Sequence, residues 1–377
     1  MDIQTQNKTT RRTFWAVFAF YLLIAFEFLY MASPFAVYFY AAYRPGLTLL
    51  ASLPAVAWSS TFFLPHIVVE TSSPWIDAHN VIGAIMFLVG LLAFAACAGQ
   101  VYYHKLTRRA EVTGGLYRYI RHPQYAAFIL SSFGMLILWP RFLALILFVT
   151  MVFVYYFLAR LEERECEEKF GRSYIDYKER TGMFLPAKLN LPTGLPSLPR
   201  AGLPRVLAIV VLYAASLSIA ILLGYGIKRW ALNSLYAAYS PGAAYISIAE
   251  MEPATLERIA AIACSSDEVQ RRLALAGPQA RFINYVAPTE WFVSEIPMND
   301  GRGHILPQDY DRNQYKVIFT LAQIPAGRLA EGQQILLWAV HKTPVVEVWV
   351  DLSGGKVSKI LAAPETVQYD GLPVPIY

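Results

Sequence analysis

The sequence predicts an all-α polytopic membrane bundle of about five to six transmembrane helices, followed by a soluble α+β domain. Of its 377 residues, 56% are hydrophobic and only 16% are charged, which is more apolar surface than a soluble core can bury. The apolar residues form continuous blocks long enough for a helix to cross about 30 Å of hydrocarbon. A membrane β-barrel would instead show short alternating segments.

Residues 1–78 are predicted to form N-terminal membrane helices, from apolar blocks at residues 14–43 and 47–64. The first block is too long for the core of a secretory signal peptide, so we expect a retained anchor. Pro34 and Pro54 interrupt the two blocks. One of the blocks could therefore be re-entrant or interfacial instead of spanning the membrane.

Residues 79–186 are predicted to form a membrane core with three further spans. These spans are the apolar blocks at residues 80–102, 125–138 and 142–158. Only three residues, centred on Pro140, separate the last two blocks. The two helices should therefore form a hairpin whose open ends lie on the same side of the membrane.

Positive charge marks the loop before this hairpin as cytoplasmic. Its five cations are Lys105, Arg108, Arg109, Arg118 and Arg121, against the single acidic residue Glu111. Cytoplasmic loops carry such an excess. The three cations before residue 14 would place this loop outside if all intervening blocks crossed. Because we give the five loop cations the greater weight, either one of the first two blocks does not span the membrane or the N-terminus faces outward.

The remaining chain is predicted to form a linker, a last span and a separate domain. Proline and glycine recur through residues 187–204, which indicates an extended linker. Residues 205–227 form the last predicted transmembrane helix, so the α+β domain at residues 228–377 should lie on the opposite, extracytoplasmic side.

Within the α+β domain the patterns predict one helix at residues 253–275, starting at a proline suited to the first helical turn. They also predict strands, which include residues 281–286, 335–340 and 345–352, and a closing hairpin through Ser353, Gly354 and Gly355. The run VEVWVDLSGGKVSKIL weakly resembles PepSY-type modules.

Two classes of site are not expected. Cys97, Cys166 and Cys264 are scattered, without paired spacing or a neighbouring histidine, so we expect no metal site and no disulfide framework. The net charge of +5 is small. Because the cations cluster in a membrane loop, they do not indicate nucleic-acid binding.

Candidate functional side chains lie just before and just after the hairpin in the sequence. In GGLYRYIRHPQY, residues 114–125, His122 precedes Pro123 and is therefore presented at a helix N-terminus, which favours anions. After the hairpin, Glu163 lies seven residues before Phe170 and shares its apolar stripe, with Glu162 close to the same face. Carboxylates that face inward at a membrane exit require a positive partner.

These two segments, at about residues 80–186, resemble the isoprenylcysteine carboxyl methyltransferase and phospholipid methyltransferase family of integral membrane methyltransferases. The matching positions are Gly115, Tyr117, Arg121, His122, Pro123, Tyr125, Arg160, Glu162, Glu163, Phe170, Gly171, Tyr174 and Tyr177. The sequence departs from the family pattern at Leu116, where proline is common.

The resemblance implies a pocket for S-adenosyl-L-methionine at the cytosolic face of a membrane, here expected to be a bacterial inner membrane. The implied cofactor-binding residues are Gly115, Tyr117, Arg121, His122, Tyr125, Arg160, Glu162 and Glu163. The implied catalytic residues are Tyr125, His122 and Glu163. The methyl acceptor would be a carboxylate, amine, hydroxyl or thiol of a lipid or lipophilic substrate that enters from the membrane, and a carboxylate alone would need no general base.

Two alternatives remain open from the sequence. Sterol-type reductases share the architecture and a similar Arg-His-Pro motif with NADPH as cofactor, but their motif usually continues with asparagine, where this chain has Gln124. The chain could also be a non-catalytic methyltransferase-like subunit that joins a membrane complex through residues 228–377.

Overall fold

The computed structural model describes residues 15, 22, 49–50, 52–107, 112–189, 202–293, 295–296, 298, 304–326, 328–364 and 374–377. All of the predicted anchor at residues 14–43 except residues 15 and 22, and most of the predicted linker, therefore lie outside the described residues, as do Arg108 and Arg109. The chain divides into two compact units. A helical unit comprises residues 1–41, 84–134 and 147–213, and a sheet unit comprises residues 42–83, 135–146 and 214–377.

Three described helical segments are long and apolar enough to cross a membrane. They are Pro74–His104, Phe142–Phe170 and Gly202–Ser234. The first contains the short helix α3 (Pro74–Asp77) and α4 (His79–Leu106), and the others are α6 (Phe142–Phe170) and α8 (Gly202–Ser234). Helix α5 (Pro123–Leu138) has 16 residues, and its length of about 24 Å is marginal for a span.

The apolar block at residues 47–64 differs from an uninterrupted span. After residue 52 the chain leaves the α-helix through turns, the 3-10 helix η1 (Ala57–Ser60) and an irregular segment. Pro54 lies at this change, where a proline cannot continue the helical hydrogen bonds. The total of five to six spans stays a prediction, because most of residues 1–48 lie outside the described part.

The α5–α6 hairpin is present, and its helices pack through aromatic side chains in the helical unit. The ring centroids of Tyr125 and Tyr155 are 4.7 Å apart, and those of Phe133 and Phe148 are 5.6 Å apart. The two helices run antiparallel, because the partner on α6 changes from Tyr155 to Phe148 as the residue on α5 changes from Tyr125 to Phe133.

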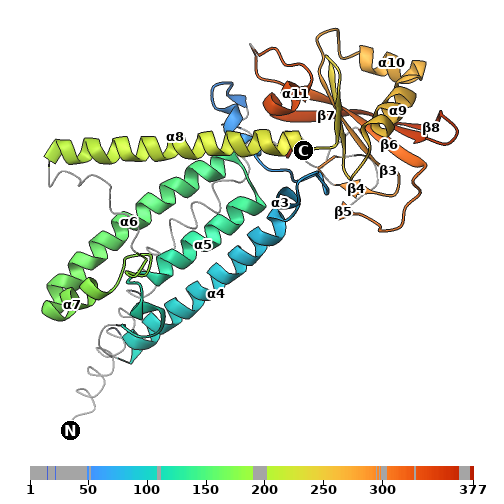
Figure 1. Ribbon diagram of the computed structural model, residues 1–377. Coiled ribbons are helices and arrows are strands. Elements are labelled where there is room, and N and C mark those ends of the chain that lie inside the picture. Colours follow the sequence, from blue (N-terminus) through green and yellow to red (C-terminus); the bar gives the residue numbers. More distant parts are fainter. Residues whose placement is uncertain are drawn as a thin grey trace, which may run out of the picture. The chain divides into compact units, whose positions relative to one another are not determined.

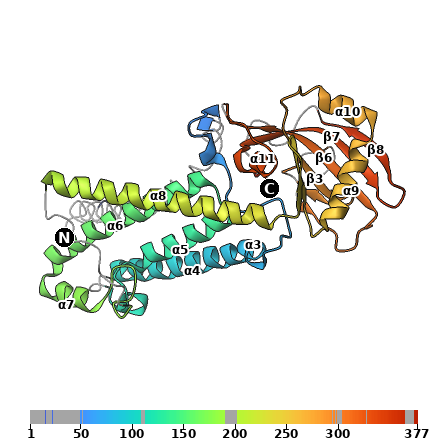
Figure 2. The same cartoon turned by 45° about the horizontal axis from the view of Figure 1, so that its top comes forward.

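Helices α4 and α5 lie side by side (Figure 2) and approach closely at Gly90. A Cβ atom at Gly90 would lie 2.4 Å from the backbone nitrogen of Ser131. The Ser131 hydroxyl also donates to the carbonyl of Phe87 at 3.2 Å. Glycine is required here because any side chain would meet the backbone of α5.

The sheet unit contains a six-stranded sheet in the order β1-β2-β3-β6-β7-β8. The strands are β1 (Ala237–Tyr239), β2 (Ala243–Ser247), β3 (Phe282–Pro288), β6 (Gln314–Gln323), β7 (His341–Asp351) and β8 (Lys356–Ala362). Strands β2 and β3 are parallel, with Ala244 opposite Ile283, whereas the other neighbours are antiparallel. Strands β4 (Phe292–Val293) and β5 (His304–Ile305) form a separate pair.

Helices α9 (Pro253–Cys264) and α10 (Asp267–Ala274) connect β2 to β3 and cover the sheet (Figure 1). Leu256 and Ile259 of α9 and Val269 of α10 are fully buried against Val317 and Val348. A parallel strand pair needs a crossover of this kind, so the two helices both join the strands and provide the core.

Two predictions for this domain were wrong, and two strands were missed. The helix predicted at residues 253–275 divides at Ser265 and Ser266, because the backbone of Ser266 is extended and α10 begins after it. The strand predicted at residues 335–340 is the helix α11 (Gln333–Trp338). Strands β1 and β2 were not predicted, whereas the closing hairpin of β7 and β8 is confirmed.

The segment at residues 61–73 joins several parts of the sheet unit through its backbone. Phe63 N donates to Pro140 O at 2.8 Å, in the turn between α5 and α6. His66 N donates to Tyr377 O at 2.7 Å, and Val69 N donates to Ile248 O at 2.9 Å. These hydrogen bonds fix the backbone of the segment against the α5–α6 turn and against the sheet unit.

Replacing Gly90 by alanine should lower the free energy of unfolding by about 1–3 kcal/mol, because the added methyl group presses on the backbone of α5. Gly99→Ala is the matched control on the same helix, since a Cβ there meets nothing within 4 Å, and it should stabilise by up to about 1 kcal/mol. Thermal unfolding in one detergent measures both variants. Equal melting temperatures would contradict the close α4–α5 contact.

Candidate active site

The position of His122 is set by a strand-like contact with the chain that follows α7 (Arg172–Arg180). Arg121 N donates to Gly182 O at 2.8 Å, and His122 N donates to Met183 O at 3.1 Å. Gly182 fits this turn because a Cβ there would lie 1.8 Å from the carbonyl of Leu185. His122 is consequently held at the start of α5 with only 4% of its surface exposed.

The imidazole of His122 lies between the two predicted glutamates of α6. His122 Nδ1 is 3.3 Å from Glu162 Oε2, and His122 Nε2 is 3.7 Å from Glu163 Oε1. Burial alone would lower the pKa of His122, but the carboxylates of Glu162 and Glu163 outweigh burial and raise this pKa above its ordinary value. The histidine and the paired acids that were predicted to converge are therefore in contact.

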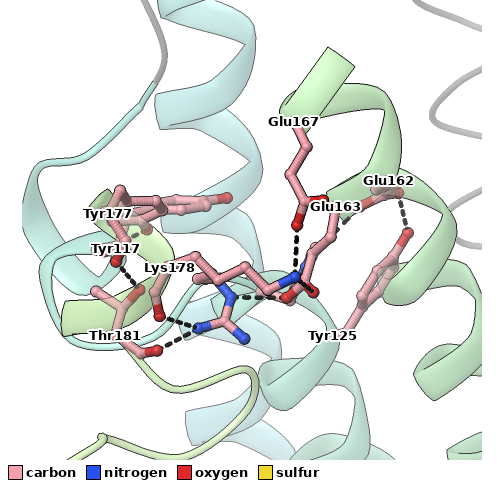
Figure 3. A network of polar contacts seen from close by, with 10 residues as sticks. Tyr117, Tyr125, Glu162, Glu163, Glu167, Tyr177, Lys178 and Thr181 are labelled. Carbon is pink, nitrogen blue, oxygen red and sulfur yellow. Dashed lines mark hydrogen bonds and ion pairs between the residues drawn. The ribbon is translucent and has the colours of Figure 1, made fainter. Parts of the chain in front are cut away.

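Glu163 is the centre of a buried ion network. Its side chain is 1% exposed, with Arg121 Nε at 2.6 Å from Oε1 and Lys178 Nζ at 3.1 Å from Oε2. Figure 3 shows Lys178 reaching between Glu163 and Glu167, and its distance to Glu167 Oε1 is 2.6 Å. Each charge in this network has an opposite partner, which is the condition for burying it.

Arg121 uses its guanidinium to hold α7 in place. Besides the ion pair with Glu163, its Nη1 atom donates to the carbonyls of Lys178 and Thr181, at the end of α7. Three contacts of this side chain are thus made within the protein. Arg121 therefore connects Glu163 of α6 to the end of α7.

Glu162 differs from Glu163 because it is partly accessible. Its side chain is 33% exposed, and its Oε1 atom accepts a hydrogen bond from the hydroxyl of the fully buried Tyr125 (Figure 3). The rings of His122 and Tyr125 are stacked with centroids 5.7 Å apart and an angle of 15° between their planes. The partly accessible carboxylate of Glu162 is therefore held by a buried tyrosine and a buried histidine.

Other predicted site residues lie in the surrounding structure. Gly115 adopts a φ of +61° in the 3-10 helix η2 (Gly115–Arg118). Tyr117 is buried, its hydroxyl donates to Gln124 Oε1 at 3.0 Å, and its carbonyl accepts from Tyr177. The side chain of Arg160 makes no hydrogen bond or ion pair with another described residue.

Sequence reasoning missed Lys178. It also missed the fold-back, the segment at Gly182 and Met183 whose backbone pairs with residues 120–122. Lys178 follows the buried Tyr174 by four residues, so it shares the inward face of α7. That helical spacing could have identified it. The fold-back carries no comparable signal, because it depends on pairing with residues about 60 positions earlier.

The family comparison supports the predicted resemblance. Residues 80–173 match the family model described as phospholipid methyltransferase. The chain is 31% identical over 96 residues to protein-S-isoprenylcysteine O-methyltransferase B of Arabidopsis thaliana, which covers 24% of this chain and 48% of that protein. It is 25% identical over 135 residues to protein-S-isoprenylcysteine O-methyltransferase of Saccharomyces cerevisiae, which covers 33% of this chain and 56% of that protein.

A further relative is named for a different acceptor. The chain is 35% identical over 72 residues to methanethiol S-methyltransferase 1 of Bradyrhizobium diazoefficiens, which covers 19% of this chain and 24% of that protein. The chain thus spans about half or less of the length of these relatives. No solved structure matches the chain.

Glu163→Ala should lower the free energy of unfolding by about 3–5 kcal/mol, because it leaves the Arg121 guanidinium buried without its carboxylate. Glu167→Gln is the control, since the pair with Lys178 is partly exposed and its loss should cost about 1 kcal/mol or less. Denaturation in detergent compares the two variants. Similar losses for both would show that the buried network does not stabilise the fold.

The stabilisation by His122 should disappear as the pH rises. A folded-state pKa above the ordinary value of 6.5 contributes stability that is complete below that value and is lost through the higher, folded pKa, at about 1.4 kcal/mol for each unit of difference. The stability difference between the parent protein and His122→Gln should therefore be larger at about pH 5.5 than at about pH 9. A stability difference between the two proteins that does not change with pH would contradict a raised pKa of His122 in the folded state.

Proposed function

We propose, from the match of residues 80–173 to the phospholipid methyltransferase family, that this protein transfers a methyl group from S-adenosyl-L-methionine to a membrane-embedded or lipophilic acceptor. The observation that carries this proposal is the meeting of both family segments at one place. His122 and Tyr125 from the first segment contact Glu162 and Glu163 from the second. The curated relatives are named as methyltransferases that act on isoprenylcysteine and methanethiol.

The charges of the site fit this cofactor. S-adenosyl-L-methionine would supply an electrophilic methyl group on a sulfonium and carries an ammonium and a carboxylate as well. Glu162 offers an accessible carboxylate to a cationic group, and the hydroxyl of the buried Tyr125 orients this carboxylate. His122, whose Nδ1 and Nε2 atoms face Glu162 and Glu163 at 3.3 Å and 3.7 Å, holds these two carboxylates in place.

The structure favours different roles for the two adjacent glutamates. Glu163 is 1% exposed and already paired with Arg121 and Lys178, so it is a positioning residue in this proposal. Glu162 is the carboxylate left to contact a ligand. This assignment revises the sequence-based expectation that Glu163 acts as a catalytic residue.

Methyl transfer chiefly requires alignment and exclusion of water. Tyr125 is fully buried and donates to Glu162, so the two side chains hold each other in one orientation. An amine, hydroxyl or thiol acceptor would lose its proton to Glu162, the accessible carboxylate of the site. His122 is less suited to that role, because both of its ring nitrogens already face the carboxylates of Glu162 and Glu163.

The proposal places this site on the cytoplasmic face of a bacterial inner membrane, as the cations of the neighbouring loop indicate. The domain at residues 228–377 would then lie on the opposite side, joined by the linker at residues 187–204 and the predicted span at residues 205–227. A partner protein in the membrane could bind that domain, and a lipid or lipophilic substrate would enter the site laterally.

Calorimetry on the detergent-solubilised protein should show binding of S-adenosyl-L-methionine and none of NADPH. Glu162→Gln should raise the dissociation constant about tenfold to a hundredfold, because it removes a charged hydrogen-bond partner. Glu165→Gln, an exposed residue on the same helix, should leave it unchanged. Affinity for NADPH alone would favour a reductase, and affinity for neither, with stoichiometric partner proteins co-purifying, would favour a non-catalytic subunit.

A further inference from the structure

A column of buried aromatic rings adjoins the candidate active site within the helical unit. It begins at His122 and Tyr125 of α5 and continues through Tyr155 of α6 to Phe128 of α5 and Phe94 of α4. Each of these residues is at most 8% exposed, and Tyr125 and Tyr155 are fully buried. His122 and Tyr125 match the family pattern, whereas Tyr155 is not among the matching positions.

The orientation of the Tyr125 ring depends on two stacked neighbours. The ring centroids of Tyr125 and Tyr155 are 4.7 Å apart, with an angle of 23° between their planes. The ring of His122 is stacked on Tyr125 as well, at the longer distance of 5.7 Å. Stacked aromatic pairs are favourable beyond the apolar area that they bury. Tyr155 therefore makes the closer of the two ring contacts, and it makes it from the other helix of the hairpin.

The Tyr125 side chain extends along α6 from Tyr155 to Glu162. Its ring stacks on Tyr155, and its hydroxyl donates to Glu162 Oε1 (Figure 3). Tyr155 and Glu162 are seven positions apart, which is about two helical turns, so they share one face of α6. Ala159 lies between them on that face and is fully buried, with only a methyl group as its side chain. One tyrosine is thus held by its ring at Tyr155 and by its hydroxyl at Glu162.

Tyr155 is supported in turn by rings from α5 and α4. The rings of Phe128 and Tyr155 are almost parallel, with centroids 6.2 Å apart and an angle of 4° between their planes. Phe128 stands against Phe94 of α4 with a centroid distance of 3.7 Å. Helix α4 also meets the backbone of α5 at Gly90. The column therefore connects the packing of α4, α5 and α6 to the Tyr125 side chain.

We propose that Tyr155 is a positioning residue, which fixes the Tyr125 ring so that the Tyr125 hydroxyl holds the Glu162 carboxylate ready for a cationic group of the cofactor. This inference rests on the proposed methyl-transfer function. Tyr155 itself touches no ligand, because it is fully buried. A carboxylate that is already oriented loses less conformational freedom when it binds, and this preorganisation raises affinity.

Calorimetry with S-adenosyl-L-methionine on the full chain in maltoside micelles tests this role. Tyr155→Leu removes the ring and should raise the dissociation constant about threefold to tenfold, which corresponds to the contribution of one aromatic pair. Tyr155→Phe keeps the ring and should bind as the parent protein does. An unchanged affinity in Tyr155→Leu would overturn the proposal.

Phe148→Leu is the matched control. It removes one ring of another aromatic pair of the same hairpin, in which the centroids of Phe133 and Phe148 are 5.6 Å apart. Both leucine variants should melt at a lower temperature than the parent protein, but only Tyr155→Leu should bind the cofactor more weakly. An equal loss of affinity in both variants would mean that any loosening of the hairpin impairs binding, which contradicts a specific role of Tyr155.

A double-mutant cycle separates positioning from other effects on binding. If Tyr155 acts through Glu162, adding Tyr155→Leu to Glu162→Gln should cause little further loss of affinity, because the carboxylate that Tyr155 orients is already gone. Fully additive losses of affinity would show that Tyr155 acts independently of Glu162, and the positioning role would then be wrong.

A second cycle tests the positioning without any cofactor. Tyr125→Phe removes the hydroxyl that donates to Glu162 and should lower the melting temperature of the parent protein. It should lower that of Tyr155→Leu by less, because the hydroxyl is no longer held in place there. A parent protein that binds no S-adenosyl-L-methionine would end the proposed methyl-transfer function, whereas an equal effect of Tyr125→Phe in both backgrounds would end the positioning role of Tyr155.

Discussion

The buried carboxylate of Glu163 is the group on which the candidate active site depends. It meets Arg121 at 2.6 Å, Lys178 at 3.1 Å and His122 at 3.7 Å, and these cations come from the start of α5 and from α7. One acid on α6 therefore fixes two other elements. An unpaired buried charge is costly, so each of these contacts favours the single arrangement in which all the charges are satisfied.

The network also explains why the hairpin alone does not complete the site. Pro123 ends the loop and starts α5, but the orientation of His122 depends on the backbone pairing with Gly182 and Met183. Arg121 fastens that segment by donating to the carbonyls of Lys178 and Thr181. Charge pairing and backbone hydrogen bonds thus act on the same few residues, and a change in either would move the imidazole.

The sequence was sufficient for the parts of this site that follow from local patterns. The hairpin, the helix start after His122 and the inward position of Glu163 all depend on spacing or on proline. Lys178 and Gly182 were missed because their roles depend on a fold-back between distant segments. In the sheet domain, residues 335–340 have a strand-like composition but form part of α11, which shows that tertiary context can override a short apolar pattern. The break at Ser266 was concealed by the apolar periodicity, which is present on both sides of it.

Two consecutive acids on a helix point about 100° apart, and this angle gives Glu162 and Glu163 different environments. Glu163 faces the fold-back and is neutralised there, whereas Glu162 stays 33% exposed beside Tyr125. A single acid could not both balance the buried cations and remain open to a cationic ligand, since each role uses the same oxygen atoms. The adjacent pair divides these demands, and its spacing on one helix keeps the two groups in a constant relation to the imidazole between them.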